Sequence, residues 1–544
     1  MVTTPAEFYD RHRELLDRAI DAAAARDYWS AYPESPSRSV YGEQAAPAGK
    51  QAFQALLGRE FPIEVPGART TVSSELSPYG IELDVRYPQG DPAALIAAAR
   101  AATPQWRALE PQERAGVAAE ILQRLNARIY ELAHAVQHTC GQAFVMAFQA
   151  GGAHAQDRGL EAVAVALAET TRIPATASGS KPQRGGDPLR LEKTSTAVGR
   201  GVALVIGCNT FPTWNSYPGL FASLVTGNPV IVKPHPGAVL PLAITVQIAR
   251  DVLTEAGLDP NLVTLAVEQR GEGIAATLAT HPEVRIIDFT GSSEFGSWLE
   301  ANARQAVVYT EKAGLNTVIV DSTDDYKGLL RNLAFSLSLY SGQMCTTPQN
   351  IFLPGTGIAT DLGPKSPAEF GADLGAALDK LLGDPQRAAG TLGEIVNDGV
   401  RARIAEAGDL PGVLRSALPM VIRAAPSDEK TFTREWFGPI SFLITTTSTA
   451  HSLELFRDTV RQHGALTALV HSTSPEVLAD AREAALDAGV HLSENLTGGV
   501  FVNQTAAFSD LHGTGANPAA TASLSDAAFV TGRFFTLQSR RHTS

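Results

Sequence analysis

The run Val202-Ala203-Leu204-Val205-Ile206 opens a regular alternation of short apolar segments and longer helix-like ones. Further apolar runs follow at Val230–Val232, Leu262–Val267 and Val284–Phe289. The segments between them have helical patterns, through Leu224 and over 240–256, 274–279 and 292–303. Short apolar strands that alternate with helices are typical of a parallel sheet covered by helices on both faces. The predicted fold class is therefore α/β, with a Rossmann-type nucleotide-binding domain.

Patterns outside this alternation predict further elements. Pro5–Arg26 is a charged helix-like stretch, and residues 33–47 after it are rich in Pro and Ser. Between Glu113 and His138, apolar residues recur every three or four positions, which predicts one amphipathic helix. Residues 174–188 are rich in Pro, Gly and Ser, and they predict a loop or an exposed hairpin.

Composition excludes several classes of protein. The 544 residues carry a net charge of −13, and this acidity argues against a nucleic-acid partner. The chain has no apolar run of the roughly eighteen residues that a membrane span needs, and Met1–Arg18 has no signal-peptide pattern. The three cysteines, Cys140, Cys208 and Cys345, are too few for a disulfide framework. We expect a cytoplasmic protein without a membrane segment, in a compartment that keeps thiols reduced.

The pair Cys345 and Glu311 carries the chemistry that the sequence suggests. Cys345 follows a helix-like run, 329–340, and Glu311 ends a short apolar strand, 306–310. Taken alone, a single cysteine is most often a small buried hydrophobe, and a single glutamate a solvated charge. A thiol nucleophile, however, needs a base that activates water to break its covalent intermediate. Both residues stand at element ends, where catalytic groups collect, so we predict covalent aldehyde oxidation.

Three ordered motifs resemble the aldehyde dehydrogenase superfamily. They are Glu311-Lys312-Ala313-Gly314-Leu315-Asn316, Gly342-Gln343-Met344-Cys345-Thr346 and Glu435-Trp436-Phe437-Gly438-Pro439. The resemblance runs from about Val202 to the C-terminus. Phe211-Pro212-Thr213-Trp214 makes the chain most similar to the aldehyde dehydrogenases of phenylacetate degradation, without the hydratase domain that is fused to some of them.

This resemblance implies a division of the chain. Residues 1–75 would form an N-terminal helical extension, and 76–313 the nucleotide-binding domain, with a possible oligomerisation hairpin near 174–200. An α/β catalytic domain would span 314–495, and 496–544 would be a return segment. Its apolar stretch Phe534–Gln538 resembles the family's strand that pairs across a subunit boundary, so the resemblance implies a small β oligomerisation element and a homodimer or homotetramer.

The resemblance also implies how a coenzyme binds. Gly291 and Ser292, between a strand and a helix, would receive the pyrophosphate. Glu435 would accept from the nicotinamide ribose, and Phe437 would lie against the ring, although simple core packing is the alternative for Phe437. Lys233, in Lys233-Pro234-His235-Pro236, would contact the adenosine ribose.

Pro236 bears on the choice of coenzyme. In the family, a glutamate three residues after the lysine often accepts the 2′-hydroxyl, and here that position is Pro236. The loss of a carboxylate removes both a repulsion of NADP and a hydrogen bond that favours NAD, so NADP is the preferred expectation. The alternative is that Pro236 only shapes a turn and that both coenzymes bind.

The oxyanion donor is where the chain departs from the family. The family supplies an Asn side chain, but the register from Asn228 and Lys233 places Thr210 at that position. Asn209 takes the role instead if the loop shifts by one residue. With Thr210 at the donor position, Phe211 and Asn215 would lie at the substrate channel, with Asn215 in the following helix.

The resulting expectation is NAD(P)-dependent oxidation of a small-molecule aldehyde through a cysteine thiohemiacetal and thioester. The substrate would be a semialdehyde or aromatic aldehyde of phenylacetate-type catabolism. Two alternatives stay open, a CoA-acylating aldehyde dehydrogenase, which usually lacks the glutamate base, and a non-catalytic nucleotide-binding homologue. His463, His471 and His512 are scattered, and no ligand spacing suggests a metal, so none is expected.

Overall fold

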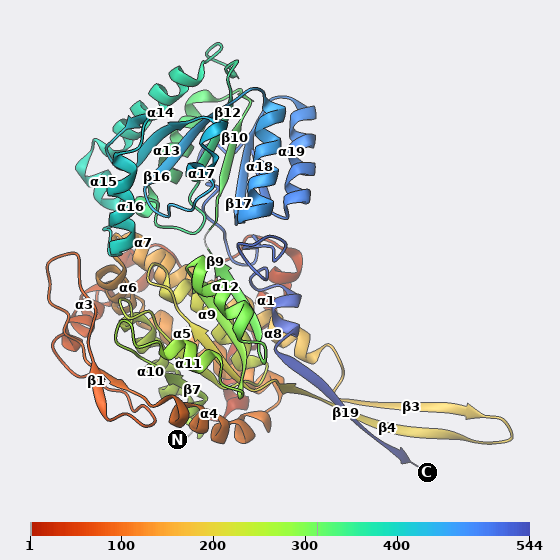
Figure 1. Ribbon diagram of the computed structural model, residues 1–544. Coiled ribbons are helices and arrows are strands. Elements are labelled where there is room, and N and C mark those ends of the chain that lie inside the picture. Colours follow the sequence, from red (N-terminus) through yellow and green to blue (C-terminus); the bar gives the residue numbers. More distant parts are fainter. Residues whose placement is uncertain (1–2, 313, 544) are drawn as a thin grey trace.

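Two lobes and a protruding arm make up this protein in a computed structural model that describes residues 3–312 and 314–543 (Figure 1). The N-terminal part of the chain, up to residue 312, builds the lower lobe in that view. The chain then passes into the upper lobe, and it returns to the lower lobe after residue 495. None of the helices in these ranges combines the length and the apolarity that crossing a bilayer requires.

The lower lobe contains a five-stranded parallel sheet in the order β7-β6-β5-β8-β9. The chain enters the sheet at β5 and adds β6 and then β7 on one side. It next adds β8 and then β9 on the other side of β5, so the connections diverge between β5 and β8. A divergence of this kind opens a crevice at the carboxyl ends of the strands, where nucleotides bind in doubly wound folds. The predicted α/β class with a Rossmann-type domain is confirmed. The strands are β5 (Val202–Ile206), β6 (Val230–Lys233), β7 (Val263–Leu265), β8 (Val284–Gly291) and β9 (Val307–Lys312).

Helices cover both faces of this sheet, and in one place they differ from the prediction. The expected single helix over 113–138 is two helices that meet at Arg128, because Arg128 leaves helical geometry (φ −107°, ψ 19°) and its guanidinium binds the Glu131 carboxylate at 2.7 Å. Apolar periodicity continues across the break, so spacing alone could not find it. The helices are α4 (Pro92–Arg107), α5 (Pro111–Ala127), α6 (Ile129–Cys140), α8 (Ala155–Thr171), α9 (Pro212–Val225), α10 (Leu240–Glu255), α11 (Ile274–Ala279) and α12 (Ser293–Asn302).

The first 75 residues share the core of the lower lobe. Helix α1 (Pro5–Ala25) packs on α5 and α8, and it buries Phe8 and Leu16 completely. Glu75 is also buried, and its carboxylate accepts from the backbone N–H groups of Val239 and Leu240 at the start of α10. The N-terminal segment therefore stabilises the chain between β6 and α10. Its other elements are α2 (Arg38–Tyr41), α3 (Ala45–Leu56) and β1 (Thr70–Val72).

The upper lobe is built on a seven-stranded sheet in the order β14-β15-β16-β12-β10-β17-β18. All neighbours are parallel except β14 and β15. The strands are β10 (Thr317–Val320), β12 (Asn350–Pro354), β14 (Val413–Arg415), β15 (Met420–Ala424), β16 (Ile440–Thr446), β17 (Thr467–His471) and β18 (His491–Glu494). The main helices around it are α13 (Tyr326–Ser338), α14 (Pro367–Leu382), α16 (Asp398–Gly408), α18 (Thr449–His463) and α19 (Pro475–Ala488).

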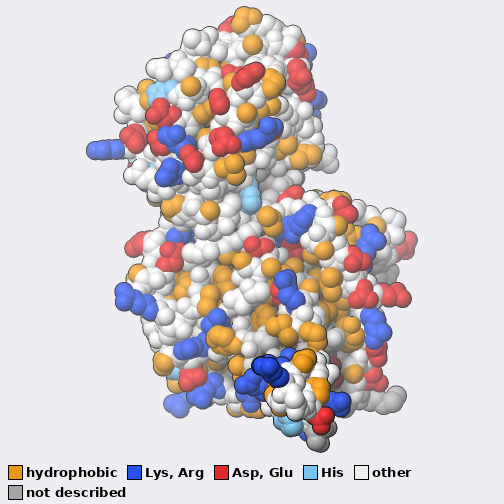
Figure 2. Space-filling model, turned by 90° about the vertical axis from the view of Figure 1, so that its right-hand side faces the viewer, with side chains coloured by type: hydrophobic (Ala, Val, Ile, Leu, Met, Phe, Trp, Pro, Cys, Tyr) orange, Lys and Arg blue, Asp and Glu red, His pale blue; other side chains and the backbone are white. Residues whose placement is uncertain are grey.

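The arm is a three-stranded antiparallel sheet in the order β19-β4-β3. Strands β3 (Thr176–Gln183) and β4 (Gly186–Gly199) form the hairpin that was one of the two readings of residues 174–188. Strand β19 (Phe534–Thr543) pairs with β4 along its whole length. Figure 2 looks along the arm and shows Lys and Arg side chains gathered on it.

Arg533 anchors the arm to the lower lobe. Its guanidinium, which is fully buried, binds both carboxylate oxygens of Asp288 on β8, at 2.6 and 2.8 Å. We expect Arg533→Met to lower the free energy of unfolding by about 3–5 kcal/mol, because it leaves a buried carboxylate without its cation. Urea denaturation measures this change. Arg541→Ala is the matched control, since its pair with Glu192 is exposed on the arm and should change stability far less. Equal stability losses in the two variants would contradict the anchoring role.

Candidate active site

Cys345 lies at the waist between the lobes, in a loop that α13 and a following 3₁₀ turn hold in place. Tyr340 and Ser341, just before it, have left-handed backbone angles (φ 53° and 52°). Gly342 follows with φ 66°, and a Cβ there would meet the carbonyl oxygen of Gly438 at 2.5 Å. Strained backbone of this kind is concentrated at functional sites. The turn therefore fixes both the Cys345 loop and its contact with the loop that carries Phe437.

Glu311 reaches the same point from β9 of the lower lobe. It lies within this strand, which continues to Lys312 and so extends beyond the predicted strand over 306–310. The side chain is 5% exposed, and its Oε1 accepts from Asn215 Nδ2 at 3.1 Å. Asn215 stands in the first turn of α9, as the register predicted. The structure thus brings together Cys345, Glu311 and Asn215 from three separate elements.

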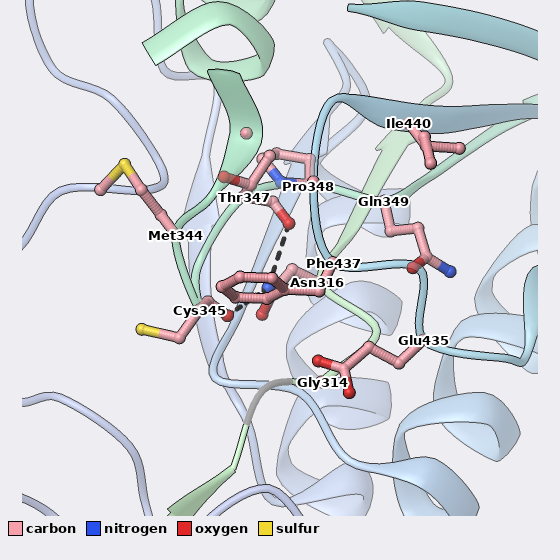
Figure 3. Close-up of a pocket in the computed structure, with 12 residues that line it drawn as sticks. Gly314, Asn316, Met344, Cys345, Thr347, Pro348, Gln349, Glu435, Phe437 and Ile440 are labelled. Atoms are coloured by element: carbon pink, nitrogen blue, oxygen red, sulfur yellow. Dashed lines mark hydrogen bonds between the residues drawn. The ribbon is translucent and has the colours of Figure 1, made fainter. Parts of the chain in front are cut away.

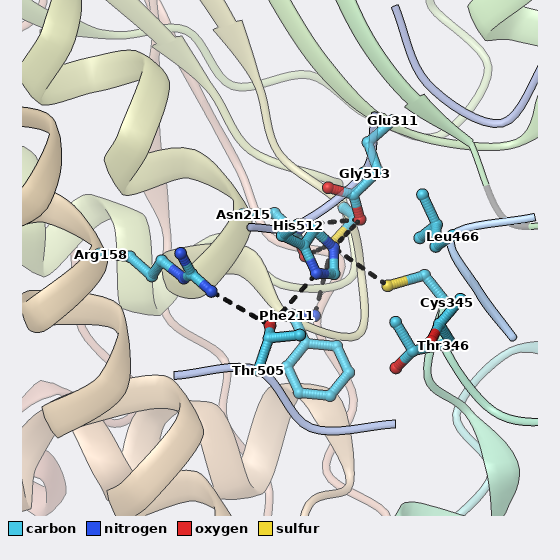
Figure 4. Close-up of polar contacts among 12 residues, drawn as sticks. Arg158, Phe211, Asn215, Glu311, Cys345, Thr346, Leu466, Thr505, His512 and Gly513 are labelled. Atoms are coloured by element: carbon cyan, nitrogen blue, oxygen red, sulfur yellow. Dashed lines mark hydrogen bonds and ion pairs between the residues drawn. The ribbon is translucent and has the colours of Figure 1, made fainter. Parts of the chain in front are cut away.

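His512 completes this group, and the sequence analysis did not assign it there. Its Nε2 lies 3.2 Å from Glu311 Oε1 and 4.0 Å from Cys345 Sγ, so the ring stands beside both side chains (Figure 4). The residue is 4% exposed and comes from the return segment, far along the chain. In the sequence it is one of several scattered histidines, and no local spacing links it to Cys345 or Glu311.

Burial and charge set the protonation of this group. Burial raises the pKa of the Cys345 thiol well above its usual range, and the nearby Glu311 charge raises it further. Burial also acts to raise the pKa of Glu311, but the charge that His512 carries when it is protonated, together with hydrogen bonds to His512, Cys345 and Asn215, outweighs it, so the pKa is lowered overall. Glu311 is therefore favoured as a carboxylate and Cys345 as a thiol.

The other side of the imidazole is held by a polar chain. Thr505 Oγ1 lies 3.3 Å from His512 Nδ1, and Arg158 Nη2 donates to Thr505 Oγ1 at 3.1 Å (Figure 4). Trp214 packs edge-on against the ring, with centroids 4.7 Å apart. These contacts fix the imidazole in one orientation.

The two candidate oxyanion donors lie on different sides of the loop after β5. The Thr210 hydroxyl is 4.0 Å from Cys208 Sγ, which in turn lies 3.6 Å from Asn215 Oδ1. Asn209 instead faces Gly237, and its Nδ2 is buried without a hydrogen-bond partner among the described residues. Phe211 packs against Tyr340 in an apolar cluster next to Met344. Thr210 is thus the residue linked to the Asn215 side of the site, and its role as donor stays a prediction.

A pocket opens on the other face of Cys345. Figure 3 shows the Phe437 ring between Cys345 and the Glu435 carboxylate, both at the wall of this pocket. Burial raises the pKa of Glu435 to about 7, against the opposing charge of Arg403. Glu435 Oε1 is buried without a partner among the described residues. This carboxylate is therefore free to accept from a bound hydroxyl.

The remaining predicted nucleotide residues stand at the carboxyl ends of the lower-lobe strands. Gly291 ends β8, and the Ser292 hydroxyl caps α12 by accepting from Phe295 N–H. Pro236 accepts from Ser74 through its carbonyl. His235 Nδ1 accepts from Gly237 N–H, and burial lowers the pKa of this imidazole to about 4.

Lys233 has a partner that the sequence analysis missed. It ends β6, is buried, and forms an ion pair with Glu268, which follows β7. Glu268 also accepts from the N–H of Ile274 at the start of α11, at 2.8 Å. A carboxylate therefore stands beside the lysine even though position 236 is a proline.

The prediction that no metal binds rested on sequence spacing alone. The structure brings together three side chains of ligating types, since atoms of Glu311, Cys345 and His512 all lie within 4.8 Å of one another. Spacing could not show this, because the three come from distant segments. The absence of a metal stays a prediction.

Comparisons with known proteins identify the family and the fold of the chain. The aldehyde dehydrogenase family model matches residues 85–507. A crystal structure of an NAD-dependent aldehyde dehydrogenase from Burkholderia multivorans is 54% identical, with a TM-score of 0.97 over 99% of both chains. A 1-pyrroline-5-carboxylate dehydrogenase of Thermus thermophilus is 20% identical, with a TM-score of 0.74 over 95% of this chain and 99% of that one, and it supports the fold alone.

Curated relatives match shorter stretches. Betaine aldehyde dehydrogenase 2 of Rhizobium meliloti is 28% identical over 64% of this chain and 66% of its own length. N-succinylglutamate 5-semialdehyde dehydrogenase of Burkholderia multivorans is 28% identical over 48% of this chain and 50% of its own length. The chain thus spans between half and two thirds of these two relatives. The narrower likeness to enzymes of phenylacetate degradation stays a prediction, but the family model covers most of the sequence, and the chain belongs to the aldehyde dehydrogenase family.

Proposed function

We propose that this protein oxidises an aldehyde to a carboxylic acid with a nicotinamide coenzyme and that Cys345 is its nucleophile. The observation that carries the proposal is the position of Cys345. One face of it meets Glu311 and His512, and the other lines the pocket of Glu435 and Phe437. A thiol with a base on one side and a nucleotide pocket on the other suits covalent oxidation followed by hydrolysis.

The thiolate of Cys345 adds to the aldehyde carbon and forms a thiohemiacetal. Loss of hydride from that carbon gives a thioester on Cys345, and a bound nicotinamide would supply the hydride acceptor. Glu311 then takes a proton from water, which attacks the thioester and releases the acid and the thiol. Asn215 orients Glu311 for this step, since it donates to Oε1.

We propose NAD as the preferred coenzyme, which revises the expectation based on Pro236. That expectation rested on the missing carboxylate at position 236, but the carboxylate of Glu268 lies beside Lys233. A carboxylate there can accept from a 2′-hydroxyl and repels a 2′-phosphate. The NAD-dependent relative that is 54% identical supports the same choice.

Glu268→Gln is expected to lower the ratio of kcat/KM for NAD to that for NADP by about tenfold, because it removes the repulsion and leaves Lys233 available to a phosphate. Steady-state rates with both coenzymes measure this ratio. Glu272→Gln is the matched control, because Glu272 is an exposed carboxylate in the same loop. An unchanged ratio in Glu268→Gln would assign the preference elsewhere.

Glu435 predicts a pH dependence of coenzyme binding. Its pKa of about 7 means that the carboxyl gains its proton as the pH falls from 8 to 6. If the carboxylate accepts from the nicotinamide ribose, the coenzyme KM should rise about tenfold over that interval. Glu435→Gln should have a high KM at pH 8 and little further change at pH 6. A wild-type KM that does not vary between these pH values would contradict this role.

For the substrate we propose a semialdehyde, with the aromatic aldehydes of phenylacetate-type catabolism as the narrower hypothesis. The relatives include a semialdehyde dehydrogenase, which supports a semialdehyde as the substrate. Coenzyme reduction should be measured with aliphatic semialdehydes, betaine aldehyde and aromatic aldehydes, each with and without free CoA. Turnover that ignores CoA supports the hydrolytic enzyme. Dependence on CoA would instead assign acyl transfer, and nucleotide binding without any turnover would support a binding homologue.

We also propose that the arm joins subunits. Large apolar side chains stand exposed on it, namely Leu189 (39%), Phe535 (48%) and Leu537 (59%). An exposed strand edge with apolar side chains is well suited to pairing with another chain. Light scattering should give a dimer or a tetramer of the 57.5 kDa chain, and a monomer would contradict the proposal.

A further inference from the structure

The proposed reaction needs negative charges on both Cys345 and Glu311, and these two side chains lie close together. The proposed function needs a thiolate at Cys345 and a carboxylate at Glu311, in a buried site where the atoms lie within 4.8 Å of each other. Two like charges this close strongly oppose each other's ionisation. A positive charge beside both groups would let the two anions coexist.

We propose that His512 takes the thiol proton of Cys345 and so acts as the base that generates the nucleophile. The proton moves from Sγ to Nε2, which leaves a thiolate and an imidazolium. The imidazolium then lies 3.2 Å from Glu311 Oε1 and neutralises one of the two anions. Glu311 stays ionised and keeps its separate task at the thioester. This inference rests on the proposed function, since it assumes that Cys345 is a nucleophile.

The surroundings of the ring fit this transfer. The transfer requires the tautomer with its proton on Nδ1, which Thr505 Oγ1 can accept, so that Nε2 has the lone pair near Cys345 Sγ. The N–H that Nε2 gains in the transfer then donates to Glu311 Oε1. Arg158 donates to the same hydroxyl and would oppose a cation at His512, but it is paired with Glu161 at 2.9 Å, and both side chains are fully buried.

The other neighbours complete the electrostatic picture. The edge of the Trp214 ring faces His512, and it carries no ionisable group. Cys208, whose Sγ lies 3.6 Å from Asn215 Oδ1, has a pKa that burial raises to about 11, so it stays a neutral thiol. Among the described residues, Glu311 and Cys345 are therefore the ionisable groups that His512 Nε2 contacts.

Alkylation of Cys345 by iodoacetamide as a function of pH tests the inference without aldehyde or coenzyme. The thiolate is the reactive form, so the rate reports its population. His512→Gln keeps a donor for Glu311 but cannot take the proton. We expect it to slow labelling of Cys345 at pH 7 at least tenfold and to move the profile to higher pH. Mass spectrometry of the labelled peptide separates Cys345 from the buried Cys140 and Cys208.

Two further variants separate the roles. His463→Gln, an exposed histidine on α18, is the matched control and should label as the wild type does. Glu311→Gln should label at least as fast as the wild type, because it removes the opposing anion. If Glu311 is the base for Cys345, Glu311→Gln will instead slow labelling and His512→Gln will not, and that result overturns the inference.

If His512→Gln does not fold, His512→Ala with added imidazole tests the same proton transfer. Restoration of labelling by imidazole in this variant alone would support proton transfer through the ring. Labelling of the folded alanine variant that matches the wild type without imidazole would refute it. The proposed function fails separately, if the wild type labels as expected but reduces no coenzyme with any aldehyde.

Discussion

Cys345→Ala should lose aldehyde oxidation completely, with kcat at least about 10⁴-fold below that of the wild type, because no other group can form the covalent intermediate. The loss should extend to the first turnover, so rapid mixing should show no burst of reduced coenzyme. Coenzyme binding, followed by quenching of intrinsic fluorescence, should remain, since the Glu435 pocket keeps its other lining residues.

Cys140→Ala is the matched control for this loss. Cys140 is fully buried and lies outside the candidate site, so its replacement should leave turnover close to that of the wild type. Residual oxidation by Cys345→Ala above a few parts in ten thousand would mean that another nucleophile or a direct hydride transfer carries the reaction.

Glu311→Gln should separate oxidation from hydrolysis. Hydride leaves before water attacks, so this variant should release about one reduced coenzyme per site in a rapid burst. Steady-state turnover should then fall by about 10²–10⁴-fold, the usual contribution of a general base. Stopped-flow absorbance measures both phases, and an acyl group on Cys345 should be detectable by mass spectrometry.

The absence of a burst in Glu311→Gln would contradict the assignment, because it would place Glu311 in the oxidation step. Glu283→Gln, an exposed carboxylate of the same lobe, controls for the loss of a negative charge and should behave as the wild type. A burst in Glu311→Gln together with none in Cys345→Ala would assign the two residues to successive steps.

Local patterns in the sequence were enough to predict the strands of the lower-lobe sheet and to single out Cys345 and Glu311 as catalytic candidates. The apolar runs around Val202–Ile206 predict parallel strands because a strand buried on both faces must be apolar throughout. Cys345 and Glu311 could be paired through the spacing of their motifs. The helix over 113–138 was predicted as one element, since the apolar spacing does not register the change of direction at Arg128.

Which side chains meet at the waist was decided only by the tertiary structure. His512 reaches Cys345 across 167 residues, because the return segment folds back between the lobes. Glu268 reaches Lys233 because β7 lies beside β6 in the sheet. The sequence by itself determined the strands of the lower-lobe sheet and singled out Cys345 as the candidate nucleophile, since periodicity and motifs are local. The charges around that nucleophile depend on chain segments that only the packing of the two lobes brings within a few ångströms.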